Sequence, residues 1–136
     1  MHIVRLAFIG VAWLFLACVV VQVFLAGLGV FAGAHSFTVH REFGYIFGWL
    51  TLVLLTLAII GRLGRRWIGL SVVMLVLFAF QSVFVALRDV VPAVAALHPV
   101  NALAIFAVAL HVARRSIKLA PNAPTIVEPA PVTTHA

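Results

Sequence analysis

The sequence predicts an all-α membrane protein: a transmembrane four-helix up-down-up-down bundle made of two tandem helical hairpins. Two observations predict this fold. First, 65% of the 136 residues are hydrophobic and only 9% are charged, whereas about a quarter of the residues in a soluble domain are charged. Second, the charged residues divide the chain into four apolar stretches, each close to the roughly 20 residues that a helix needs to cross the hydrocarbon core. Helices are expected because they satisfy their own backbone hydrogen bonds in lipid.

The four stretches predict helices at about 6–30, 43–61, 67–87 and 93–112. The first stretch runs without a charge through Cys18 and is longer than the ~7–15 apolar residues of a signal peptide, so it predicts a helix that is retained. We therefore expect one transmembrane domain over residues 1–118. Residues 119–136 contain four prolines and few residues that pack, which predicts a disordered cytoplasmic tail.

Basic residues gather on one side of the predicted membrane, at Arg5, 62–66 and 113–118. The other two connections each hold one basic and one acidic residue and carry no net charge. The positive-inside rule then predicts a multi-pass membrane protein with both termini in the cytoplasm. The net charge of +6 has the same origin, so it predicts no nucleic-acid partner.

The two predicted hairpins resemble one another. His40 comes 18 positions after Gln22, and His98 comes 17 positions after Gln81. In each hairpin the glutamine lies in the outer half of the first helix and the histidine lies near the start of the second. A helical hairpin used twice is a common way to build a membrane bundle.

The two histidines are the predicted metal ligands. The second and fourth helices run in the same direction and stand diagonally across an up-down-up-down bundle, so His40 and His98 are expected at similar depth near the outer surface. Two neutral imidazoles facing each other across a bundle are what a six-coordinate haem iron requires. The expected cofactor is one haem.

Residues around the histidines complete the predicted site. Small residues follow each histidine on the same helix face and are expected to leave room for the macrocycle. An asparagine would donate a hydrogen bond near a ligand, an aromatic ring would pack against the porphyrin edge, and two arginines would meet the haem propionates. The predicted cofactor-binding residues are Gly44, Gly48, Ala102, Asn101, Phe106, Arg41, Arg88, Gln22 and Gln81.

Each of these residue types also has a purely structural interpretation. A histidine at a membrane boundary is often an interfacial polar residue, and glycines in membrane helices most often serve close packing. Gln22 and Gln81 are expected to hydrogen-bond across the bundle, an interpretation we prefer to a role in binding a quinone. Arg41 and Arg88 fit the pattern of interfacial side chains that extend to water.

The segments "VHREFGYIFGWLTLVLLTLA" (39–58) and "LHPVNALAIFAVALHVARR" (97–115) resemble the histidine-bearing helices of the haem A synthase superfamily. The chain is also similar to small four-helix bacterial membrane proteins that carry "Q..LAG", "HR.FGY" and "LHPVNAL". The resemblance implies a b-type haem held by His40 and His98. Haem A synthases fuse two such halves, and a single half lacks part of the synthase machinery.

The other histidines and motifs add no second site. His111 lies 13 residues after His98 without a matching histidine on the second helix, so it is expected at the cytoplasmic interface, and His35 is expected in an outer loop. The sequence contains no CxxC, no HExxH and no glycine-rich phosphate loop, and so predicts neither zinc nor nucleotide chemistry.

Two functions therefore remain open from the sequence. The first is an integral membrane b-type haem protein that transfers electrons near the outer face, with a quinone or a redox protein as partner in addition to the lipid bilayer. The second is a non-redox four-helix membrane protein, or a small subunit of a larger complex, in which the same residues only pack.

Overall fold

The computed structural model describes residues 1–33 and 35–120, and all regular structure in this part of the chain is helical. The predicted tail therefore lies outside the described residues from position 121 onward. The elements are α1 (His2–Phe31), α2 (His35–Ile60), α3 (Arg65–Ala86), α4 (Pro92–Ala95), α5 (Leu97–Ser116) and the 3-10 turn η1 (Ile117–Leu119). The predicted all-α class is confirmed.

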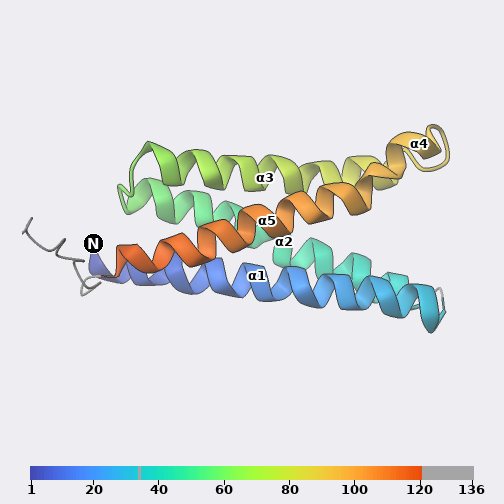
Figure 1. Cartoon of the computed structure of the whole chain (residues 1–136), viewed down its shortest axis with the longest axis horizontal. Helices are drawn as coiled ribbons and strands as arrows, with labels where there is room; N and C mark the ends of the chain where they lie inside the picture. Colours follow the sequence, from blue (N-terminus) through green and yellow to red (C-terminus); the bar gives the residue numbers. More distant parts are fainter. Residues whose placement is uncertain (34, 121–136) are drawn as a thin grey trace, which may run out of the picture.

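The four long helices pack as a ring of neighbours. Helix α2 contacts α1 and α3, and α5 contacts the same two helices, so α2 and α5 stand on a diagonal (Figure 1). Helix α5 crosses the bundle obliquely, from beside α3 near α4 to beside α1 near the N-terminus (Figure 1). We call the end with α4 and the α1–α2 connection the distal end, and the end with the N-terminus the proximal end.

The outer surface of the bundle is apolar. Four segments are long and apolar enough to cross a membrane: His2–Phe31, Phe37–Ile60, Arg65–Ala86 and Pro92–Leu119. Large hydrophobic side chains such as Trp49 remain about two-thirds exposed (68%). Because a water-soluble protein rarely exposes so much contiguous apolar surface, the chain is a multi-pass membrane protein.

Two helix boundaries differ from the predicted ones. Helix α2 begins at His35 rather than at residue 43, so His35 opens a helix and does not lie in a loop. The last predicted helix is interrupted at Ala96, between the short α4 and the long α5. The predicted boundaries were drawn at charged residues, which mark where the chain enters the headgroup region. A helix can extend past that region as long as its backbone hydrogen bonds continue, so its ends need not lie at the charges.

A tight turn joins α2 to α3 at the proximal end. The Leu63 N–H donates to the Ala58 carbonyl at 3.1 Å and the Arg62 N–H donates to the Ile59 carbonyl at 3.0 Å, which is the Schellman pattern of helix termination. Arg62 has a φ of 48°, in the left-handed region that this motif requires. The turn fixes α2 and α3 as antiparallel neighbours.

The buried core fills the proximal end and the middle of the bundle. Its distal limit is an aromatic cluster in which the Phe15 ring centre lies 5.5 Å from that of Phe47 and 6.0 Å from that of Phe78. Beyond this cluster toward the distal end, the buried residues of the described chain are Val19, one turn after Phe15, and Gly29. Past Val19, the described residues of the distal end therefore include no buried apolar residue other than glycine.

Candidate cofactor site

The structure brings the two predicted ligands together near the distal end. His40 lies in the second turn of α2 and His98 in the first turn of α5, on the two diagonal helices. Their ring centres are 6.3 Å apart and the ring planes meet at 64°. Both side chains are partly buried. We call His40, His98, Gln22, Gln81 and Asn101 the paired-histidine site.

Each imidazole is held by the preceding helix in the same way. His40 Nδ1 donates to the main-chain carbonyl of Gln22 at 3.1 Å, and His98 Nδ1 donates to that of Gln81 at 3.2 Å. A carbonyl oxygen only accepts hydrogen bonds, so in each ring the proton lies on Nδ1 and the lone pair lies on Nε2. The sequence repeat is thus a repeat of structure: in each hairpin a glutamine carbonyl orients the histidine.

The glutamine side chains differ between the two hairpins. Gln22 Nε2 donates to the main-chain carbonyl of His40 at 2.8 Å, while Gln22 Oε1 is buried and has no hydrogen-bond partner in the described part of the chain. In the second hairpin, Gln81 Oε1 accepts from Asn101 Nδ2 at 3.0 Å. The residue equivalent to Asn101 in the first hairpin is Phe43, which offers no donor. The site therefore contains one unsatisfied buried acceptor, which is rare in a folded protein.

Protein side chains lie close to the two glycines of the predicted site. A Cβ atom on Gly44 would lie 2.9 Å from Gln22 Nε2, and one on Gly48 would lie 2.5 Å from the Phe78 ring. The two glycines therefore allow side chains of α1 and α3 to approach α2, and the space beside them is occupied by protein rather than left for a macrocycle.

The outer members of the predicted set lie at the surface. Arg41 and Arg88 are exposed, and each is paired with the acidic residue that follows it, at 2.9 Å and 3.3 Å respectively. Phe106 is 38% exposed, whereas Ala102 is partly buried. One neighbour was missed from the sequence: the Phe37 ring centre lies 6.4 Å from that of His40. Its signal is the spacing of three residues, which places both side chains on one helix face.

The donor set limits which metal centre the site can hold. Among the described residues, no three His, Cys, Asp or Glu side chains gather closely enough to bind a metal ion by themselves. A protein-bound zinc ion typically needs three or four such ligands. Two imidazoles suit a metal whose remaining ligands come with it, as the four nitrogens of a porphyrin do.

The fold and the site define a four-helix, multi-pass membrane protein with a repeated glutamine–histidine pair across its diagonal helices. A family model described as a family of unknown function, DUF6220, matches residues 22–87. The matched region contains Gln22, His40 and Gln81 but ends before His98, and it covers less than half of the chain. No curated protein and no solved structure matches the chain.

Proposed function

We propose that the chain is an integral membrane protein that binds one b-type haem through His40 and His98 and transfers electrons near one face of the membrane. The distance of 6.3 Å between the two ring centres carries the proposal. At this separation the two imidazoles, one from α2 and one from α5, would hold the iron of one haem, whose porphyrin would supply the other four nitrogen ligands.

The hydrogen bonds of the two rings support the same proposal. Metal-bound histidines usually donate their second ring nitrogen to a carbonyl or carboxylate, which fixes the ring orientation and makes the ligating nitrogen more basic. Both histidines donate from Nδ1 to a glutamine carbonyl, so Nε2 is the nitrogen available to iron in each case.

The packing of the distal end is compatible with a large, flat and apolar group. The buried core ends near Val19, one turn beyond the aromatic cluster of Phe15, Phe47 and Phe78, and the histidines lie farther toward the distal end. Because Gly44 and Gly48 are covered by protein side chains, a macrocycle would be held between the hairpins and not against these glycines. When bound, haem supplies a one-electron iron couple.

The remaining polar residues have defined tasks in this proposal. The Gln22 and Gln81 carbonyls orient the imidazoles, and Asn101 fixes the Gln81 side chain. Gln22 Oε1 is a buried acceptor without a hydrogen-bond partner. It can accept a hydrogen bond from the hydroxyl of a quinol, and the quinol would then be the electron donor. Arg41 and Arg88 can bind the anionic haem propionates in place of Glu42 and Asp89. Their present ion pairs with these two carboxylates are exposed and therefore weak.

The packing function remains the second candidate, because every residue of the paired-histidine site already makes a hydrogen bond to the protein. Titration of the purified, haem-free protein with haemin distinguishes the haem-binding function from the packing function. We expect saturation at one haem per chain, with the sharp visible bands of a low-spin complex. A His40→Ala/His98→Ala double variant is the control. Equal haemin uptake by the two proteins, or none by the wild type, would favour the packing function.

We further propose that the proximal end faces the cytoplasm of a bacterial cell, which places the paired-histidine site toward the outer face. Support comes from the basic residues at Arg5, 62–66 and 113–118, all at the proximal end. A reporter enzyme that is active only outside the cytoplasm should be active when it is inserted after Gly33. A reporter that is active only in the cytoplasm should be active when it is fused after Ala136. The opposite pattern would reverse the orientation and the depth assigned to the site.

A further inference from the structure

A second concave feature lies at the proximal end, far along the bundle from the histidine pair. It is a hollow of about 580 Å³ along the last turns of α5. We call it the basic groove; its lining residues are Ala107, Leu110, His111, Arg114, Arg115 and Lys118. We propose that the basic groove binds the phosphate headgroup of an anionic phospholipid.

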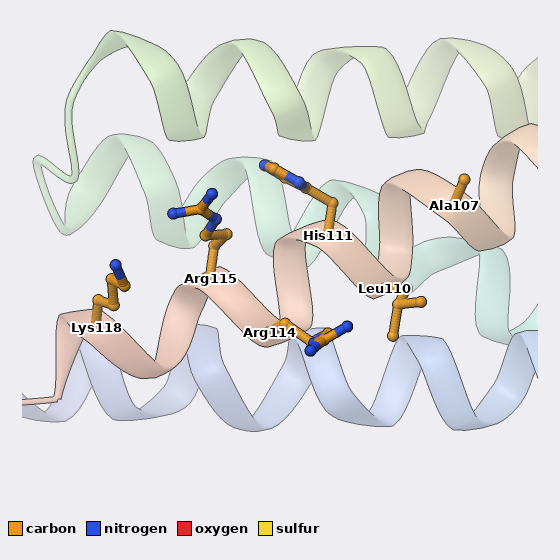
Figure 2. Close-up of a pocket in the computed structure, with 6 residues that line it drawn as sticks. All are labelled: Ala107, Leu110, His111, Arg114, Arg115 and Lys118. Carbon is orange, nitrogen blue, oxygen red and sulfur yellow. The ribbon is translucent and has the colours of Figure 1, made fainter.

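The polar side chains of the groove converge. His111 and Arg115 of α5 and Lys118 of η1 point to the same side, toward α2 and α3, whereas Arg114 points toward α1 (Figure 2). This follows from the helix period, since residues four and seven positions after His111 return to nearly the same face. Arg66 of α3 also reaches the groove, where its Nη2 donates to His111 Nε2 at 3.3 Å. Two helices therefore contribute positive charge to one spot.

These charges have no acidic partner within the described residues. The acidic residues of this part of the chain are Glu42 and Asp89, which lie at the distal end and pair with the arginines beside them. A cluster of arginine and lysine side chains without a carboxylate favours an anion. Phosphate suits it, because a guanidinium binds phosphate oxygens in a bidentate manner and an ammonium adds a point charge.

The position of the groove identifies the phosphate as that of a lipid. The membrane-spanning segment that contains α5 ends at Leu119, so the cations lie where headgroups lie. Ala107 and Leu110 line the same groove about one to two helical turns deeper in the membrane than Arg115. The groove thus changes from apolar to cationic along the helix, in the order in which a phospholipid changes from acyl chain to phosphate.

Native mass spectrometry of the full-length protein in detergent tests the proposal. The probes are dioleoylphosphatidylglycerol and dioleoylphosphatidylcholine, which share their acyl chains and differ in net charge. We expect the wild type to retain one phosphatidylglycerol per chain in preference to phosphatidylcholine. Each basic residue near an anionic headgroup is worth about fivefold in affinity, so Arg115→Gln/Lys118→Gln should weaken retention by about 25-fold.

Two matched variants control for charge and folding. Arg5→Gln/Arg65→Gln removes two positive charges from the same end outside the groove and should retain the lipid, as should the charge-preserving Arg115→Lys/Lys118→Arg. Equal weakening by Arg5→Gln/Arg65→Gln would mean diffuse attraction and overturn the proposal. Equal retention of phosphatidylcholine would also overturn it. Displacement of the lipid by inorganic phosphate at equal concentration would show a site for free phosphate instead.

Discussion

Replacing either His40 or His98 by alanine is expected to abolish the low-spin haem spectrum. Iron held by two imidazoles loses one axial bond in each variant, which leaves a five-coordinate, high-spin complex of weaker affinity. We expect haem affinity to fall at least tenfold in each single variant and to be lost in the double variant. Absorption spectra of the oxidised and reduced proteins show the spin state, and a haemin titration followed by the same spectra measures the haem affinity.

Two other histidines provide matched controls. His35 is exposed at the start of α2, and His111 is exposed in the basic groove near the opposite end of the bundle. His35→Ala and His111→Ala should leave the spectrum unchanged. Added imidazole should restore the low-spin form of His98→Gly, because the small ligand can take the place of the lost ring. A spectrum that is unchanged in the His40 and His98 variants would exclude them as ligands.

The second large effect is expected at Gly48. A Cβ at this position would come within 2.5 Å of the Phe78 ring, so Gly48→Leu must displace either the ring or the helix. Overpacking of this kind typically costs about 1–3 kcal/mol. Unfolding by a denaturing detergent in mixed micelles measures the free energy of unfolding. Because Phe78 closes the aromatic cluster beneath the histidines, the same variant should also lower haem occupancy.

Gly69 is the matched control for this substitution, since a Cβ there meets no atom within 4 Å. Gly69→Leu should be neutral or stabilising, because leucine has the higher helix propensity. Adding Phe78→Ala to Gly48→Leu should recover part of the loss, since residues in contact are energetically coupled. Equal stability of Gly48→Leu and Gly69→Leu would contradict the close approach of α2 and α3.

Much of the fold follows from the sequence because lipid imposes one strong rule. An apolar stretch of about 20 residues in a bilayer becomes a helix, and short connections make successive helices antiparallel. The extra turns of α2 before residue 43 and the break at Ala96 did not follow, because hydropathy reports depth in the membrane and not the ends of helices.

Part of the candidate site could also be predicted from the sequence. The spacings of 18 and 17 residues between glutamine and histidine are visible in the sequence, and they place each histidine beside the helix that precedes it. The atoms in contact could not be predicted, because the histidines bond to main-chain carbonyls and not to glutamine side chains. Likewise, nothing in the sequence shows that Gly48 faces Phe78, a contact that depends on the rotation of α3 about its axis.

The reduced-minus-oxidised absorption spectrum of wild-type protein, purified from membranes of cells supplied with a haem precursor, tests the central claim most directly. A haem b held by His40 and His98 predicts a reducible Soret band with sharp visible bands and one haem per chain. A folded, membrane-extracted protein without haem would contradict that claim and leave the paired-histidine site as a packing element between α2 and α5.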